Sequence, residues 1–337
     1  MDWEPPAEWI RVRTIDAHAG GEPLRIVTEG FPDLAGATML ERRRFACEHC
    51  DLLRKALMWE PRGHADMYGC IVTPPASADG DFGVLFLHNE GYSTMCGHGI
   101  IALVKVGLET GFLARPAGRD ELRIDTPAGR VRAQLREDGA VSFLNVPSFV
   151  LEEDVELEVP GLGPVRCDLA FGGAFYAYVD ARELGLGLRP ADAGALIDAG
   201  RRIKAAVGAS RRIAHPAGDA DLGFLYGTIF VGHAEGEAHS RNVCVFADDE
   251  VDRSPTGTGV SGRAALLYAR GELAPGESIR IESILGTTFE VAVRETVRVG
   301  GLDAVVPEVT GTAHVTGRHE FLLDPHDPLR GGFFLRG

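Results

Sequence analysis

Apolar and polar positions alternate near the start of the chain and predict a two-stranded hairpin over residues 11–29. The Gly20-Gly21 pair between the two runs is typical of a tight turn. Glycine supplies 43 of the 337 residues, about twice the usual share, which indicates many tight turns between short strands. Further strands are predicted over residues 70–72, 84–88, 122–126, 131–135, 141–146, 167–179, 221–231 and 242–246.

Helical spacing, with apolar residues three to four positions apart, occurs in fewer stretches. We expect helices over residues 38–59, 100–110 and 190–207. Gly111 follows the second of these helices at a position where glycine commonly ends a helix. Residues 152–164 are rich in Pro, Glu and Gly and are the best candidate for a domain boundary.

One pattern occurs twice. Cys96-Gly97-His98-Gly99 matches Thr256-Gly257-Thr258-Gly259, and each copy begins a helix-like run that stops at a glycine fifteen positions on. The similarity continues into the next strands, where residues 122–126 align with residues 279–283. An internal repeat of this length indicates two similar domains related by a pseudo-twofold axis.

The repeated turns carry the candidate chemistry. A turn that opens a helix presents free N–H groups and the positive end of the helix dipole, so Cys96 could have a lowered pKa and act as a thiolate. Two such helix N-termini that face each other across a cleft would bind a carboxylate. The alternatives are a small buried cysteine in a glycine-rich turn, and a duplicated domain whose glycine turns are only structural.

Charge and composition narrow the class of protein. The net charge of −15 disfavours nucleic acid and anionic membranes as partners, and no apolar run is long enough to span a bilayer. The acidic N-terminus does not resemble a secretory signal, and six scattered cysteines indicate free thiols in a reducing cytoplasm. Cys47 and Cys50 form a C-x-x-C that could be a redox or zinc motif, but packing within a helix is favoured.

Together these motifs resemble the proline racemase family, and the likeness covers nearly the whole chain. It rests on residues 16–25, 61–69, 95–99, 252–259 and 317–332. The resemblance implies an α+β fold of the diaminopimelate epimerase type: two pseudo-symmetric domains, each a mixed sheet wrapped around a central helix, with the active site between them.

The same resemblance sets the expected domain limits. We expect an N-terminal domain over residues 8–160 that carries Cys96, and a C-terminal domain over residues 161–315 that carries Thr256. We expect the tail, residues 316–337, to pack back on the N-terminal domain.

Thr256 departs from the pattern of the racemases and epimerases of this family, which carry a cysteine in both turns. A threonine hydroxyl is too weak an acid for reversible proton exchange at neutral pH, so racemisation should fail. Threonine at this position resembles the trans-3-hydroxy-L-proline dehydratase branch of the family. The implied function is a hydro-lyase that converts trans-3-hydroxy-L-proline into Δ1-pyrroline-2-carboxylate.

The resemblance also implies roles for the site residues. Cys96 would remove the Cα proton, Asp252 would bind the ring ammonium, and the hydroxyl could be protonated by Cys96, Thr256 or water. No cofactor or metal is expected, because the substrate carboxylate is the electron sink. The carboxylate would be bound by the N–H groups of Gly97, His98, Gly257 and Thr258.

Other interpretations stay open at this point. The protein could be an epimerase, racemase or lyase for another proline derivative, or a non-catalytic imino-acid binding protein, and it could form a homodimer. His98 could contribute only its backbone, Asp252 could cap the helix at Gly257, and Thr256 could only fill space. His18, His64 and Tyr226 are possible pocket residues for which scaffold roles are favoured.

Overall fold

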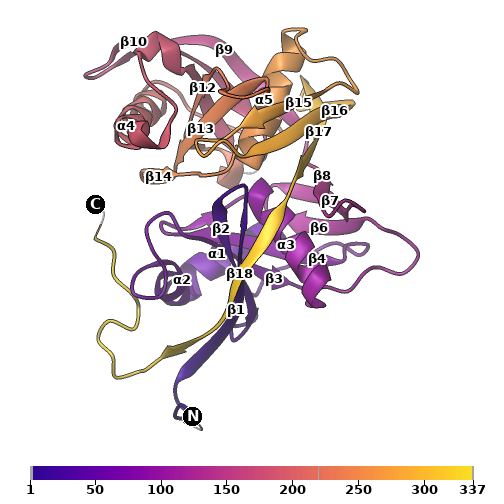
Figure 1. Cartoon of the computed structure of the whole chain (residues 1–337), viewed down its shortest axis with the longest axis vertical. Coiled ribbons are helices and arrows are strands. Elements are labelled where there is room, and N and C mark those ends of the chain that lie inside the picture. Colours follow the sequence, from indigo (N-terminus) through magenta and orange to yellow (C-terminus); the bar gives the residue numbers. More distant parts are fainter. Residues whose placement is uncertain (1–2, 219, 336–337) are drawn as a thin grey trace.

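The computed structural model describes residues 3–218 and 220–335, which form two lobes stacked along the long axis of the molecule (Figure 1). The lower lobe contains the first half of the chain and the last strand. Its elements are β1 (Ile10–Ala19), β2 (Glu22–Glu29), α1 (Met39–His49), α2 (Asp51–Met58), β3 (Tyr68–Thr73), β4 (Phe82–His88), β5 (Tyr92–Ser93), α3 (Gly97–Thr110), β6 (Leu122–Thr126), β7 (Gly129–Leu135), β8 (Val141–Leu144) and β18 (Ala313–Leu323).

The upper lobe holds the elements between β8 and β18. They are β9 (Ser148–Val159), β10 (Gly163–Phe171), β11 (Phe175–Asp180), α4 (Ala193–Ser210), β12 (Leu225–Gly232), β13 (Ser240–Phe246), β14 (Glu250–Val251), α5 (Gly257–Ala269), β15 (Ser278–Glu282), β16 (Thr288–Val299) and β17 (Leu302–Gly311), with short 3₁₀ turns at Ala181–Leu184, Pro190–Asp192 and Ala220–Leu222.

Hydrogen bonds link all the strands into one 18-stranded mixed sheet network that runs through both lobes. Most neighbouring strands are antiparallel, whereas β2–β3, β4–β6, β11–β12 and β13–β15 are parallel. With its few helices packed on this sheet, the molecule is α+β, as the family resemblance implied at that coarse level.

One helix runs through the core of each lobe. α3 packs against β1, β2, β7, β8 and β18, and α5 packs against β9, β10, β16 and β17. Ile100, Ile101 and Leu103 of α3 are fully buried, as are Val260 and Leu266 of α5. Most residues of α3 and α5 are buried, so the strands surround both helices and hold their N-termini in place.

Local structure differs from the sequence predictions in three places. The helix expected over residues 38–59 is broken at Cys50, whose N–H closes α1 on the Ala46 carbonyl before α2 begins. Residues 152–164, expected to mark a boundary, form most of the β9–β10 hairpin, because residues 155–159 pair with residues 163–167. The strand expected from residue 221 begins only at Leu225, after a 3₁₀ turn.

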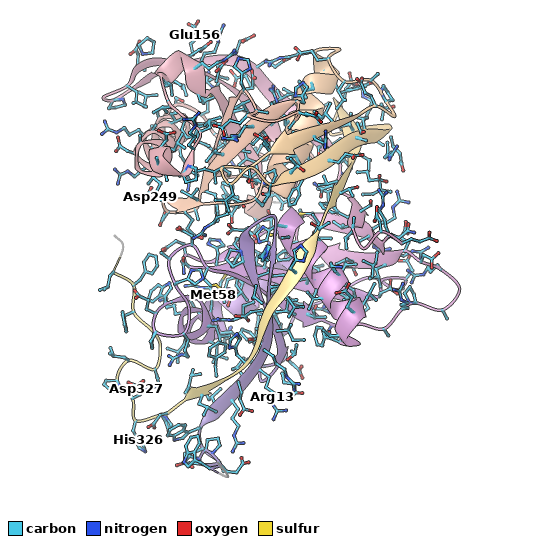
Figure 2. The ribbon with its side chains drawn as sticks, viewed as in Figure 1. Arg13, Met58, Glu156, Asp249, His326 and Asp327 are labelled. Atoms are coloured by element: carbon cyan, nitrogen blue, oxygen red, sulfur yellow. The ribbon has the colours of Figure 1, made fainter. Side chains whose placement is uncertain are left out.

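The final strand returns to the lower lobe and runs antiparallel to β1 along its whole length. The pairing extends from Ile10 opposite Leu323 to Ala19 opposite Ala313. Arg13, labelled in Figure 2, supports this arrangement on the surface, because its guanidinium pairs with Glu29 of β2 and Glu320 of β18 at 2.9 and 3.0 Å. β18 therefore completes the lower lobe, whose first strand is β1.

Neither part of the chain, 3–218 or 220–335, contains a helix long and apolar enough to cross a membrane. Within the same residues, no three His, Cys, Asp or Glu side chains gather as metal ligands would. Cys47 is an exposed free thiol and Cys50 a buried one.

Candidate active site

The N-termini of α3 and α5 meet backbone to backbone at Gly97 and Gly257. A Cβ atom placed on Gly97 would lie 2.4 Å from the Cα atom of Gly257, and one placed on Gly257 would lie 2.5 Å from the Cα atom of Gly97. Only glycine allows this approach, because any side chain at either position would overlap the opposite backbone. The predicted opposition of two helix N-termini is therefore present in the fold.

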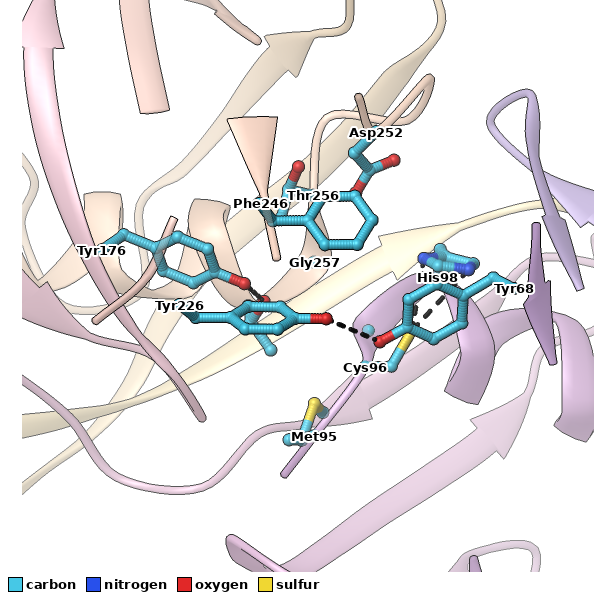
Figure 3. A pocket seen from close by; sticks show the side chains of 12 residues that line it. Tyr68, Met95, Cys96, His98, Tyr176, Tyr226, Phe246, Asp252, Thr256 and Gly257 are labelled. Carbon is cyan, nitrogen blue, oxygen red and sulfur yellow. Dashed lines mark hydrogen bonds between the residues drawn. The ribbon is translucent and has the colours of Figure 1, made fainter. Parts of the chain in front are cut away.

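A small pocket lies beside this contact, between the two lobes. Figure 3 shows its walls, to which the lower lobe contributes Cys96 and the upper lobe contributes Thr256. All seven residues that the sequence singled out for the site line this one pocket. The full lining is Tyr68, Met95, Cys96, Gly97, His98, Tyr176, Tyr226, Phe246, Asp252, Thr256, Gly257 and Thr258.

Cys96 is the N-cap of α3, and its sulfur accepts a hydrogen bond from the Gly99 N–H at 3.2 Å. That bond favours the thiolate, as the sequence predicted. Burial dominates, however, and together with the nearby carboxylates of Asp252 and Glu22 it raises the pKa of the Cys96 thiol well above its ordinary value. The sequence prediction of a lowered pKa is therefore wrong, because burial between the lobes removes the water that would solvate a thiolate.

His98 lies against Cys96, with its Nδ1 atom 3.2 Å from the Cys96 sulfur. Burial lowers the pKa of the imidazole, so the ring is neutral at physiological pH and can accept a proton. The sequence left open whether His98 contributes more than its backbone; the structure places its side chain next to the thiol as well.

Thr256 occupies the equivalent N-cap of α5 in a strained conformation. Its φ is +67°, in the left-handed region that β-branched residues rarely adopt. Its Oγ1 atom is buried and has no hydrogen-bond partner among the residues that the structure describes. A buried hydroxyl without a partner costs about 1–3 kcal/mol, so a ligand that hydrogen-bonds Oγ1 would recover this free energy.

Two buried carboxyl groups lie near the thiol. Asp252 accepts a hydrogen bond from the Ser254 N–H at 2.7 Å and does not cap α5, whose N-cap is Thr256. Glu22, from the β1–β2 hairpin, is fully buried and accepts one hydrogen bond, at 2.7 Å, from the Arg253 N–H. Burial, and then the charge of Asp252, raise the pKa of Glu22 well above its ordinary value.

Sequence reasoning missed most of the aromatic wall. The Tyr68 hydroxyl donates to Ser93 Oγ at 2.6 Å and lies 3.3 Å from the Tyr226 hydroxyl, while the Tyr176 hydroxyl lies 2.7 Å from Thr258 Oγ1. These tyrosines come from strands outside the repeated motif, so no spacing signal marked them. Tyr226, for which a scaffold role was favoured, lines the pocket, whereas His18 and His64 lie outside its lining.

Comparison with known proteins adds three similarities. The sequence model of the family described as proline racemase matches residues 14–334. A trans-3-hydroxy-L-proline dehydratase from Colwellia psychrerythraea is 49% identical over 342 residues, which cover 99% of this chain and 96% of that protein. A 3-hydroxyproline 2-epimerase from Burkholderia multivorans is 47% identical over 329 residues, which cover 96% of this chain and 98% of that protein.

A solved structure shares the whole architecture. The crystal structure of a hydroxyproline epimerase from Agrobacterium vitis, with bound trans-4-hydroxy-L-proline, superimposes with a TM-score of 0.90 at 31% sequence identity. The match covers 98% of this chain and 96% of that structure.

Proposed function

The chain belongs to the proline racemase family, and from this premise we propose that its pocket dehydrates trans-3-hydroxy-L-proline to Δ1-pyrroline-2-carboxylate. The protein is then a hydro-lyase whose substrate is a small cyclic imino acid. The observation that carries the proposal is the asymmetry of the pocket, which has a thiol at one helix N-terminus and a threonine at the other.

The two helix N-termini form the proposed carboxylate site. Gly97, His98, Gly257 and Thr258 lie in the first turns of α3 and α5, where N–H groups have no carbonyl partner within the helix. Because the two helix dipoles converge, they stabilise a carboxylate and, more strongly, the extra negative charge that develops when the Cα proton leaves. The substrate carboxylate thus acts as the electron sink without a cofactor.

Substrate binding also supplies the charge that the Cys96 thiolate needs. Burial and the carboxylates of Asp252 and Glu22 disfavour the thiolate. A ring ammonium bound at Asp252 would offset these negative charges, and His98, 3.2 Å from the sulfur, can take the thiol proton. We therefore expect Cys96 to become a base only when the substrate is present.

Proton removal from Cα then leads to loss of the hydroxyl from C3. The Cys96 thiolate takes the Cα proton as general base, and the electron pair left on Cα expels the hydroxyl, which accepts a proton from an acid in the pocket and leaves as water. The enamine formed in this step tautomerises to the cyclic imine. Thr256 cannot return a proton to the opposite face of Cα, because its hydroxyl is far less acidic than a thiol.

Epimerisation is the second candidate function, because a relative at 47% identity is named a 3-hydroxyproline 2-epimerase. It requires a group on the Thr256 side of the pocket that exchanges protons near neutral pH. In this chain that position carries a hydroxyl, which favours dehydration over epimerisation.

We also propose that the two lobes are a diaminopimelate epimerase-like pair of domains. Support comes from α3 and α5, which occupy equivalent core positions in the two lobes. The pairing of β9 with β10 and β17 favours a division near residue 147 rather than near residue 160. The six free thiols support a reducing, cytoplasmic location.

A substrate panel tests the proposed activity. The purified protein is incubated separately with trans-3-hydroxy-L-proline, L-proline and trans-4-hydroxy-L-proline, the imine is trapped with o-aminobenzaldehyde, and stereoisomers are separated by chiral chromatography. We expect imine from the 3-hydroxy substrate alone. Racemised L-proline would contradict the single-thiol argument, and an epimer of 3-hydroxyproline without imine would favour the second candidate.

A further inference from the structure

We propose that the Tyr68 hydroxyl is the general acid that protonates the departing 3-hydroxyl, on the same face of the substrate ring as Cys96. This inference rests on the proposed dehydration and identifies a group that the reaction requires. It follows from the stereochemistry of the substrate and from the position of Tyr68 in the pocket.

The substrate itself fixes the face from which the acid must act. In trans-3-hydroxy-L-proline the hydroxyl and the carboxylate lie on opposite faces of the ring. The Cα proton is also opposite the carboxylate, so the proton and the hydroxyl share one face. A base that takes the proton and an acid that protonates the hydroxyl must therefore approach from the same side.

Thr256 lies on the wrong side for this task. Cys96 belongs to the lower lobe and Thr256 to the upper lobe, and they line different sides of the pocket (Figure 3). The ring of a substrate bound in this pocket would therefore lie between them. Thr256 would face the side of C3 that carries hydrogen. The acid must therefore come from the groups around Cys96, which are Tyr68 and His98.

Tyr68 is built into that side of the pocket. Its side chain is 3% exposed, and its ring stands edge-on to the imidazole of His98 with 4.9 Å between the ring centroids. Its hydroxyl is anchored by Ser93 Oγ at 2.6 Å and directed toward the Tyr226 hydroxyl at 3.3 Å. Tyr68 and Cys96 line the same pocket, and His98, against which the Tyr68 ring stands, lies 3.2 Å from the Cys96 sulfur.

The protonation states favour Tyr68 over its neighbours. Burial raises the pKa of Tyr68 well above its ordinary value, so the phenol keeps its proton until a strong base such as a departing hydroxide appears. A Cys96 thiolate, from which the reaction starts, has no proton to donate. His98 is directed at the sulfur of Cys96, so its ring serves the thiol rather than C3.

The proposed step needs no proton donor or acceptor beyond Cys96, Tyr68 and the substrate. The Cys96 thiolate takes the Cα proton, the C3–O bond breaks with its electron pair on oxygen, and the Tyr68 phenol transfers its proton to that oxygen to form water. The tyrosinate then recovers a proton from the Cys96 thiol, which restores the thiolate. The Cα proton thus replaces the one that leaves with the hydroxyl.

The test compares leaving groups in Tyr68→Phe. Chloride needs no proton to leave, so trans-3-chloro-L-proline should bypass the acid. We expect Tyr68→Phe to lower kcat about a hundredfold or more for the hydroxy substrate while turning over the chloro substrate at close to the wild-type rate. Tyr92→Phe is the matched control, because Tyr92 is a buried tyrosine of the same lobe whose hydroxyl contacts the Ala46 carbonyl outside the pocket.

The results with Tyr68→Phe decide whether Tyr68 is the general acid. Equal losses on both substrates would show a structural role for Tyr68 and overturn the proposal, as would unchanged turnover of both. A second measurement uses the wild-type enzyme. The hydroxyl of cis-3-hydroxy-L-proline would face the Thr256 side of the pocket, so this isomer should yield no imine. Comparable dehydration of the cis and trans isomers would overturn the same-face argument. If wild-type enzyme fails to dehydrate trans-3-hydroxy-L-proline, the proposed function itself is wrong.

Discussion

Gly97 and Gly257 touch at the N-termini of the two core helices, with a Cβ on one placed 2.4 Å from the Cα atom of the other. This contact sets how closely the lobes approach, and the pocket that holds Cys96 and Thr256 lies beside it. The size of the pocket and the convergence of the helix dipoles therefore depend on one pair of residues without side chains.

Gly97→Ala should separate the lobes at the site. The added methyl cannot fit against the Gly257 backbone, so the helix N-termini must move apart by about an ångström, a displacement that can cost about a hundredfold in rate. Steady-state kinetics with trans-3-hydroxy-L-proline checks this. Gly194→Ala is the matched control, because Gly194 also lies in the first turn of a helix and its added Cβ meets no atom within 4 Å. Equal activity of the two variants would show that the contact is dispensable.

Cys96→Ser should abolish turnover and keep binding. Removing a general base typically costs about a hundredfold to ten-thousandfold, while the helix N-termini that bind the carboxylate are unchanged. Calorimetry with pyrrole-2-carboxylate, a planar mimic of the intermediate, should give a Kd close to that of wild type. Cys47→Ser, at the exposed thiol, is the control and should remain fully active. Turnover by Cys96→Ser at the wild-type rate would exclude Cys96 as the base.

Thr256→Cys should create a second product. A thiol on the opposite side of the ring can return a proton to the other face of Cα, so part of the substrate should appear as cis-3-hydroxy-D-proline. Thr256→Ser keeps a hydroxyl there and should produce imine alone. Chiral chromatography of both reactions distinguishes the products, and an epimer from the serine variant would contradict the acidity argument.

Glu22→Gln should change how stability depends on pH. The pKa of Glu22 is raised in the folded protein, mainly by burial, so above the unfolded-state pKa of about 4.3 the folded state holds a proton that the unfolded state has released. Its contribution is present in full below that pH and is lost as pH rises toward the folded pKa, at up to about 1.4 kcal/mol per pH unit. Denaturant unfolding at several pH values should show wild type losing stability relative to Glu22→Gln. Parallel curves would show that Glu22 does not titrate in this way.

The repeat made the centre of the site predictable from sequence. Two matching Gly-x-Gly turns, each before an apolar helix, indicated two equivalent helix N-termini, and the residues they carry do line one pocket. Local spacing sufficed because the helix start, the cap and the reactive side chain lie within four consecutive residues in each copy.

The rest of the site depends on contacts between distant segments. Tyr68 and Tyr226 are 158 positions apart, and Glu22 meets Arg253 across 231 positions. The pKa of Cys96 is raised although its helix terminus predicts a lowered one, because burial by the opposite lobe is not visible in the sequence. The break at Cys50 and the β9–β10 hairpin are likewise settled by packing rather than by composition.

The pairing of β1 with β18 imposes an order on biosynthesis. β1 emerges from the ribosome long before β18, yet the two strands pair from Ile10–Leu323 to Ala19–Ala313. The upper lobe is in effect an insertion within the lower one and can complete its own strands β9 to β17 while the nascent chain is still growing. The lower lobe, although most of it is made earlier, leaves an open edge on β1 until β18 has been made, so the lobe that carries Cys96 is completed only after the upper lobe.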